Sequence, residues 1–558
     1  MSRREASAGA PIGGRFPVPG QARTWMAAVS AGGGSRLIVV FCLACVFATG
    51  ALACRRSIFQ DEGAIILNFA AGYLGFFAPL PYYDQAAPPL AMAVLSAFYS
   101  LEGGDLFLTR FFLLLLCWVF FAGALAVALR TRDTGLWYGL LITLAVRPIL
   151  LYATEIKQYA FEFIFTIVFL MMHLARKGDY SLRYLALFLA LGILSIFFSF
   201  SSVFIILAVM FDIVVTRESR GVRLYWAAGA VLYCLVWGAV YVVMVKPMIA
   251  FQFINYGKEY AGLTLLNVVR NGDLTSLVIM LKEVRGIGPH LFIVVAAPVL
   301  LIAGLRAKTP RAAPILPRWG EARSADHAAA RLLVWVCGGL GLLNVLGIYP
   351  FSTTRQMLYV APVIGLFLGW LVVRMLTAFG LRPAMRTALL ALMIAPAMLY
   401  NLGVAARTSY VKTDVWDLYQ FIKQHQYRHV VSWVIFDPTL QLFYGTDPDK
   451  TFEVKGLLNR NSAPNLSVAE LKRRLAANDD DIPNQLWSVL KREEDFRAYV
   501  DWVVRRVTRD DVTLIATVEI FPYQEQQLDA ALKAAGCDGR VVFEEKAVKA
   551  FEVRCAHP

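Results

Sequence analysis

The chain has 558 residues, of which 58% are hydrophobic, and its mean hydropathy of +0.57 excludes an ordinary soluble protein. Its formal net charge of +14 is unevenly distributed. Residues 405–558 carry 21 basic and 23 acidic side chains, so the whole positive excess lies in the more apolar part. Basic residues there follow the positive-inside bias of membrane proteins, which excludes nucleic acid as the partner.

Apolar runs long enough to cross about 30 Å of hydrocarbon recur up to residue 404 and not beyond it. They predict eleven transmembrane helices, at 36–54, 107–129, 135–153, 159–175, 183–198, 200–215, 224–246, 290–305, 332–348, 357–373 and 387–404. Basic residues gather in every second connection, for example at Arg130–Arg132, Arg217–Arg223 and Arg374–Arg386. This alternation predicts a multi-pass membrane protein with its N-terminus in the cytoplasm and its C-terminus outside.

Residues 1–35 are rich in Gly, Ala, Ser and Arg without periodicity, which predicts a disordered cytoplasmic tail. The stretch Ala48–Cys54 also resembles a signal-peptide cleavage site or a lipobox. However, the preceding tail is long for a signal peptide, and Ala51 stands where a lipobox has leucine. We therefore expect the first helix to be retained.

The external segment 55–106 is far longer than a connection between two helices requires. It contains two adjacent carboxylates, Asp61 and Glu62, at the water-facing end of the first span. Its apolar stretches Ala64–Phe77 and Pro88–Ser100 are too short to span, which predicts helices lying in the membrane interface. Two crossing helices would instead invert every later loop. For the two acids, the alternative to a catalytic role is that of simple interfacial charges.

A second polar cluster, Tyr152–Tyr159, lies at the same predicted face. If this segment is helical, Glu155, Tyr159 and Glu162 share one side at i, i+4 and i+7. Ionisable groups at this depth are costly and normally face a cavity, which favours an active site over a pore. The alternative is an ion-paired plug between helices, made by Glu155, Lys157 and Arg147.

The predicted spans form a membrane module over residues 36–404. Residues 405–558, which follow it, have the pattern of an extracytoplasmic α/β domain. Helices are predicted at Val415–Gln426 and Ser467–Ala476, and strands at His429–Phe436, Thr513–Ile520, Arg540–Phe543 and Ala550–Val553. The last two strands would form a hairpin that brings Cys537 and Cys555 side by side. Because disulfides persist outside the cell, we expect these cysteines to be bonded. Unpaired thiols are the alternative, since a one-residue shift in register would point them apart.

The order of these features resembles that of a known family. An aspartate-containing external loop with two interfacial helices follows one span, and Pro88-Pro89-Leu90 precedes the second of these helices. Arg110 accompanies the next span, and a Tyr-x-x-Glu-x-Lys-x-Tyr segment, a Tyr-Pro…Arg link at 349–355 and a terminal external domain complete the layout. The chain resembles the GT-C glycosyltransferases, on the side of the bacterial dolichyl-phosphate-mannose protein mannosyltransferases and the aminoarabinose transferases. The resemblance covers nearly the whole chain.

The resemblance implies a sugar donor linked to polyprenyl phosphate and an inverting transfer, and, because the family is bacterial, that the membrane is a bacterial inner membrane. Asp61 matches the first-loop aspartate that acts as general base or positions the acceptor, with Glu62 beside it. Glu155 matches the second acidic position, which organises the donor phosphate. Aminoarabinose transferases have a lysine just before the Pro-Pro pair, whereas this chain has Asp84-Gln85-Ala86-Ala87. We therefore expect Lys157, Arg147, Arg355 or a divalent cation to neutralise the phosphate, and substrate contacts from Asp84, Gln85, Gln158 and Tyr159.

Two other classes of function stay open. A lipid or solute transporter would have inverted repeats and midplane charges, but this chain has no evident repeat and its acids are expected at one face. An inert membrane scaffold with an external binding domain would leave the long segments 55–106 and 247–289 unexplained. The acceptor class also stays open: a protein, a lipid or a glycan.

Overall fold

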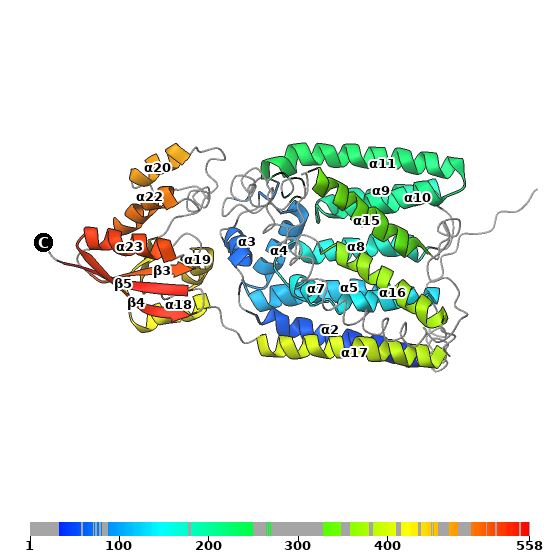
Figure 1. The fold of residues 1–558 in the computed structure, drawn as a ribbon, viewed down its shortest axis with the longest axis horizontal. Coiled ribbons are helices and arrows are strands. Elements are labelled where there is room, and N and C mark those ends of the chain that lie inside the picture. Colours follow the sequence, from blue (N-terminus) through cyan, green and yellow to red (C-terminus); the bar gives the residue numbers. More distant parts are fainter. Residues whose placement is uncertain are drawn as a thin grey trace, which may run out of the picture.

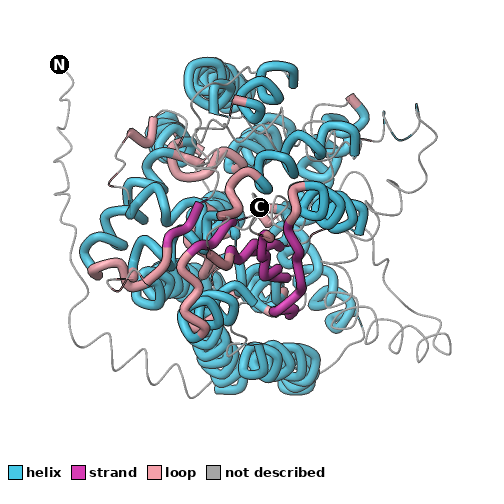
Figure 2. Tube along the Cα trace, turned by 90° about the vertical axis from the view of Figure 1, so that its left-hand side faces the viewer, coloured by secondary structure: helices cyan, strands magenta, loops and turns pink. Residues whose placement is uncertain are grey.

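The computed structural model consists of a helical bundle and a smaller sheet-containing body, arranged end to end along the longest axis (Figure 1). The structure describes residues 33–56, 58, 60–70, 72, 75–77, 80, 87–176, 180–248, 264, 266, 268, 270, 327–346, 358–378, 383–408, 414–432, 437–447, 449, 451–455, 468–477, 493–508, 511–518, 520, 522–545 and 548–556. Seen along that axis, the strands of the smaller body lie in front of the helices (Figure 2).

Within these ranges, six helices are long and apolar enough to cross a membrane. They are α2 (Gly33–Cys54), α5 (Leu106–Thr131), α11 (Arg220–Val240) with its π-helical continuation η1 (Tyr241–Val245), α15 (Ala328–Val345), α16 (Val360–Ala378) and α17 (Pro383–Thr408). The bundle also contains shorter apolar helices, namely α6 (Thr134–Leu144), α8 (Tyr159–Leu174), α9 (Leu182–Ile196) and α10 (Ser202–Thr216). Nine of the eleven predicted spans each coincide with one helix, the span 135–153 is divided between two, and the span 290–305 lies outside the described residues.

The predicted span 135–153 is wrong as a single helix. α6 ends at Leu144, and a short helix, α7 (Arg147–Tyr152), starts after Val146, whose backbone is extended (φ −78°, ψ 103°). Pro148 lies in the first turn of α7, where its missing N–H costs nothing; inside a continuous helix its ring would clash with the preceding turn. Asn401 of α17 donates to the carbonyl of Ala145 at 2.8 Å, which satisfies a group freed by the break.

Glycines allow α6 and α16 to cross at very close range. Gly135 and Gly139 are one turn apart on α6, as Gly365 and Gly369 are on α16. A Cβ atom added at Gly139 would lie 2.6 Å from the Cα of Leu366 and 2.9 Å from the carbonyl oxygen of Gly365. No side chain fits there without a shift of backbone, so this pair of helices uses the small-residue packing typical of membrane bundles.

Two short helices of the first external segment lie at the end of the bundle that faces the sheet-containing body (Figure 1). They are α3 (Gln60–Ala70) and α4 (Pro89–Leu101). α4 agrees with the prediction within one residue at each end, whereas α3 begins four residues before the predicted Ala64 and ends earlier. Asp61 and Glu62 therefore belong to the first turn of α3 and not to the loop before it. Carboxylates are favoured in a first turn by the helix dipole.

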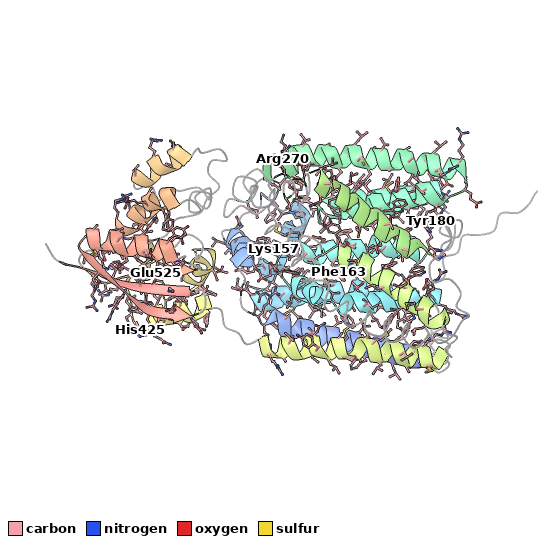
Figure 3. All side chains as sticks on the ribbon, in the orientation of Figure 1. Lys157, Phe163, Tyr180, Arg270, His425 and Glu525 are labelled. Carbon is pink, nitrogen blue, oxygen red and sulfur yellow. A yellow bond between two sulfur atoms is a disulfide. The ribbon has the colours of Figure 1, made fainter. Side chains whose placement is uncertain are left out.

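A buried ionic cluster lies at the opposite end of the bundle. Asp212 of α10 is fully buried and accepts hydrogen bonds from Arg331 Nε (2.7 Å) and Trp335 Nε1 (3.1 Å) of α15. His173 Nε2 of α8 lies 2.9 Å from the same carboxylate, and its Nδ1 is 3.2 Å from the hydroxyl of Tyr180. Figure 3 shows Tyr180 far from Lys157 along the bundle. The expectation that the acids gather at one face is therefore incomplete, because Asp212 ties three helices together at the other.

The smaller body is an α/β domain with a five-stranded sheet in the order β2-β1-β3-β5-β4. The strands are β1 (His429–Ser432), β2 (Glu453–Lys455), β3 (Thr513–Val518), β4 (Cys537–Glu545) and β5 (Val548–Cys555), and the helices are α18 (Asp414–Gln424), α19 (Asp437–Thr446), α20 (Val468–Ala476), α22 (Glu493–Val504) and α23 (Pro522–Ala534). β1 runs parallel to β2 and β3, and β5 is antiparallel to β3 and β4. An α-helical membrane bundle followed by an α/β domain is the predicted fold class.

The sheet is buried on both faces, as the alternation of its side chains requires. Val430 and Leu514 pack with Leu418 of α18 on one face, while Val431 and Ile515 pack with residues of α22 on the other. Each pair is in register on β1 and β3, so successive residues face opposite layers. Helices therefore cover both sides of the parallel strands.

The predicted hairpin is formed by β4 and β5, and its register pairs Cys537 directly with Cys555. A disulfide joins the two residues, whose Cα atoms are 3.8 Å apart, closer than the separation of about 4.4–6.8 Å expected from the sequence. An irregularity between Val541 and Phe543 shifts the pairing near the turn, and the strand ends stay in register. The disulfide therefore joins β4 and β5 at the end of the hairpin opposite the turn.

Candidate active site

A buried ion pair between Glu62 and Arg110 fixes α3 to the bundle. Arg110 Nε donates to Glu62 Oε1 at 2.8 Å, and Arg110 Nη2 donates to Oε2, a bidentate arrangement. Arg110 Nη1 also donates to the carbonyl oxygens of Cys54 (3.2 Å) and Arg56. The backbone N–H of Ile156 donates to Glu62 Oε1 at 2.9 Å. Because both charged side chains are at most 2% exposed, this pair joins α3, α5, the end of α2 and the turn after α7 into one unit.

The surroundings of Glu62 determine its charge. Burial raises the pKa of the Glu62 carboxyl, but the charge and hydrogen bonds of Arg110, together with Arg56 and the N–H of Ile156, hold the net pKa below its usual range. Glu62 is therefore an anion committed to Arg110. Asp61 occupies the preceding position of α3, and its side chain lies outside the described residues.

The second acidic cluster is a turn and not a helix face. The backbone from Ala153 to Gln158 forms turns, in which the N–H of Lys157 donates to the carbonyl of Glu155 at 2.6 Å. α8 begins only at Tyr159, so the predicted helical face is wrong for Glu155. The N–H of Ile156 is already bonded to Glu62 across 94 positions of sequence, and such a bond fixes the turn from outside. Glu155 and Lys157 are 3% and 4% exposed, so the turn buries both charges.

Arg56 brings another positive charge to this turn. Its Nη2 lies 4.0 Å from Glu155 Oε2, and its Nη1 donates to the carbonyl of Leu151 at 2.8 Å. Lys157 Nζ lies 5.8 Å from the ring centre of Tyr159, within cation–π range. Figure 3 shows Lys157 at the end of the bundle that faces the sheet-containing body. Two cations and a carboxylate therefore meet beside the Glu62–Arg110 pair.

The remaining predicted residues are placed as follows. Gln158 is partly buried and Tyr159 is buried, with the Tyr159 ring centre 5.4 Å from that of Tyr152, so both lie next to Lys157. Arg147 begins α7, and its side chain lies outside the described part of the chain. Three residues lie wholly outside it, and their contribution stays a prediction: Asp84, Gln85 and Arg355.

Sequence reasoning missed Arg56 and the pairing of Glu62 with Arg110. An arginine near the end of an apolar span is costly unless it finds a partner, so Arg110 carried a signal for a buried acid. Arg56 carried none, because a basic residue two positions after a helix is ordinarily solvated.

In the part of the chain that the structure describes, no group of three or more His, Cys, Asp or Glu side chains is placed to hold a metal ion. The two described acids of the site, Glu62 and Glu155, each lie next to a guanidinium. The divalent cation considered from the sequence therefore stays a prediction.

Neither a protein-family model nor a curated protein matches the chain. A crystal structure of ArnT from Cupriavidus metallidurans bound to undecaprenyl phosphate matches 94% of this chain and 98% of its own, at 14% identity and a TM-score of 0.52. The chain has the fold of ArnT. The apo structure of the same ArnT matches over the same shares, at 14% identity and a TM-score of 0.51.

The coverage of 94% includes both bodies, because the bundle alone is much shorter than that share of the chain. The expected fold is thus confirmed for the bundle together with its C-terminal sheet-containing domain. The arabinofuranosyltransferase AftD from mycobacteria matches 93% of this chain and 40% of its own, at 12% identity and a TM-score of 0.42.

Proposed function

We propose that this protein is a GT-C glycosyltransferase, which moves a sugar from a polyprenyl-phosphate-linked donor to an acceptor on the extracytoplasmic side of the membrane. The observation that carries the proposal is the charged cluster at one end of an ArnT-like bundle, made by Glu62, Arg110, Glu155, Lys157 and Arg56. ArnT binds undecaprenyl phosphate, a polyprenyl phosphate, in one of the matching structures. A donor of that kind keeps its chain in the bilayer while its sugar phosphate reaches the end of the bundle.

The two adjacent acids have different roles in this proposal. Glu62 is held by Arg110 and cannot leave without exposing a buried charge, so it positions α3. Successive positions on a helix are about 100° apart, so position 61 faces a different direction. We assign Asp61 the role of general base, which removes the proton of the acceptor hydroxyl as that oxygen attacks the sugar.

Arg56 and Lys157 have the charge that the departing phosphate requires. In the proposed step, the acceptor oxygen bonds to the anomeric carbon from the side opposite the phosphate, and the bond from that carbon to the phosphate oxygen breaks. Polyprenyl phosphate leaves with the electron pair, and the configuration inverts. Cations fixed beforehand near this oxygen stabilise its developing charge more than mobile ones would. Glu155, 4.0 Å from Arg56, orients that guanidinium.

The test compares cells with and without the gene by mass spectrometry of surface glycans, lipids and proteins. Loss of one sugar-modified product in the deletion strain identifies the reaction. Complementation with Asp61→Asn should lower that product about 10²-fold, because general-base contributions are typically of that size. Glu102→Gln, which changes an exposed acid after α4, is the matched control and should restore the product fully.

Normal product with Asp61→Asn, at equal protein level in the membrane, would remove Asp61 from the mechanism. If the deletion changes the distribution of a lipid-linked sugar between the two leaflets and removes no glycosidic bond, the transporter alternative replaces the proposal. Arg56→Ala and Lys157→Ala separate the phosphate contacts from the base, since each should weaken use of the donor.

A further inference from the structure

Helix α19 belongs to the external domain but packs on the bundle as well. Leu440 is fully buried in the core that α18 and the sheet form. Leu442, two positions later, is 3% exposed and is part of the hydrophobic core of the bundle. Phe443 packs against both cores. One helix of ten residues therefore joins the two bodies of the molecule through side chains within four successive positions.

The partner of α19 on the bundle is α3, the helix that carries Asp61 and Glu62. Figure 1 shows the two helices facing one another where the bodies meet. They approach closely at Gly63, the residue next to Glu62: a Cβ atom added there would lie 3.1 Å from Thr439 Oγ1 and 3.7 Å from Thr439 Cα. Thr439 is 3% exposed, so this contact is closed to water. The absence of a side chain at position 63 is what allows α19 to sit this close.

α3 is thus held from two directions. Glu62 fixes it to α5 through Arg110, while Gly63 rests against α19 of the external domain. Ile65, Ile66 and Phe69 bury the apolar side of this eleven-residue helix in the core of the bundle, so the contact at Gly63 acts on the side that faces α19. A shift of about 1 Å in a catalytic group can lower a rate by up to two orders of magnitude.

We propose that α19 of the external domain is a positioning element for the active site: its contact with Gly63 sets the orientation of α3 and of the carboxylate of Asp61. The consequence for activity rests on the proposed function, but the attachment does not. The domain is then a fixed support of the catalytic helix and stays docked during turnover.

The first arm of the test is a cross-link that needs no activity. A Cβ atom at position 63 would lie 3.1 Å from Thr439 Oγ1 and 3.7 Å from Thr439 Cα, and the Cβ of residue 439 is bonded to both of these atoms. The two Cβ atoms of the double variant Gly63→Cys/Thr439→Cys therefore fit the separation of about 3.5–4.5 Å that disulfides have. A protease site inserted between α17 and α18 reports the bond, because the two fragments stay together only without reductant. Gly123→Cys/Thr439→Cys is the control, since nothing lies within 4 Å of a Cβ at Gly123.

The second arm measures the product found in cells, per amount of membrane protein. Gly63→Ala should lower it roughly tenfold, because the new methyl group pushes against Thr439 Oγ1. Thr439→Ala in the same chain removes that oxygen and leaves contacts of 3.6 Å to Ile58 and 3.7 Å to the backbone, so product should recover. Gly123→Ala in α5 is the matched glycine control and should have no effect.

The expected result is a cross-link in most molecules, with more than half of the product level retained before reduction. A cross-link no more frequent than in the control overturns the proposal, and so does a cross-linked protein that works only after reduction. Loss of product with Gly63→Ala that Thr439→Ala fails to restore also overturns it. Failure of the proposed function would leave the cross-link unchanged, so the two failures are distinguishable.

Discussion

Removing Arg110 is the most direct way to test the architecture of the site. The substitution Arg110→Met keeps most of the side-chain volume and removes the guanidinium that lies against Glu62. The carboxylate would then remain buried, with 0% exposure, bonded to the N–H of Ile156 and without the guanidinium that binds both of its oxygens, while Arg56 is the cation that remains in its surroundings. An isolated buried charge is costly, because little of the hydration that it loses is replaced.

The size of the effect follows from the burial of both partners. Breaking a buried ion pair by removing one partner typically costs about 3–5 kcal/mol. We expect the upper half of that range, because the substitution also leaves the carbonyl oxygens of Cys54 and Arg56 without the hydrogen bonds that Arg110 donates. Adding Glu62→Gln removes the stranded charge but keeps an acceptor for Ile156, so the double variant should recover about 2 kcal/mol.

Unfolding in mixed micelles, followed by tryptophan fluorescence during titration with SDS, measures these differences. Arg110→Lys is the control for charge, since an ammonium cannot donate two parallel hydrogen bonds and should restore stability only in part. The reasoning is refuted if the free energy of unfolding of Arg110→Met lies within about 1 kcal/mol of that of the native protein. It is also refuted if the effects of Arg110→Met and Glu62→Gln on this free energy are additive in the double variant.

Two further predictions concern other parts of the fold. Gly139→Ala should destabilise the bundle by more than about 2 kcal/mol, because its methyl group would meet the backbone of α16. Gly341→Ala in α15 is the control: nothing lies within 4 Å of a Cβ atom there, so this substitution should be neutral or stabilising. The same SDS titration measures both. In the C-terminal α/β domain, hydrogen bonds from Lys423 and Tyr419 lower the pKa of Asp447 to about 2. Because this value lies below that of the unfolded chain, the stabilisation is complete above about pH 5 and is lost as the pH falls towards 2. The difference in urea stability between Asp447→Asn and the native protein, followed by limited proteolysis of the domain, should therefore disappear across that window; a difference that stays constant from pH 6 to pH 2 would contradict this cause.

The C-terminal α/β domain shows how much of a fold local sequence pattern can predict. The predicted helix Val415–Gln426 overlaps α18, which ends two residues earlier, and the predicted strands around Val430, Leu514 and Phe551 coincide with β1, β3 and β5. Alternation of side chains sets the register of a strand pair, and in a hairpin the partners are close in sequence. For that reason the pairing of Cys537 with Cys555, which are 18 positions apart in the sequence, could be predicted from the sequence between them.

The candidate site shows where such reasoning stops. Glu62 and Arg110 are 48 positions apart, and Ile156 lies 94 positions from Glu62, so no periodicity links them. Only the assembled bundle brings them together. The glycines of α6 and α16 did carry a signal, a spacing of four residues in each helix, which predicts close packing but not which helices pack.

The pairing of two acids at the start of α3 then has a physical explanation. A single carboxylate cannot both anchor a short helix and accept a proton, because the guanidinium that anchors it also lowers its pKa and occupies its oxygens. Adjacent positions of a helix face different directions, so Glu62 can bind Arg110 while position 61 is available to the proposed acceptor. On this account the anchor comes from the bundle, and the orientation about it comes from α19 at Gly63. Exchanging the two acids, Asp61→Glu with Glu62→Asp, preserves the charge but shortens the anchor by one methylene, and should therefore cost more activity than Asp61→Glu alone.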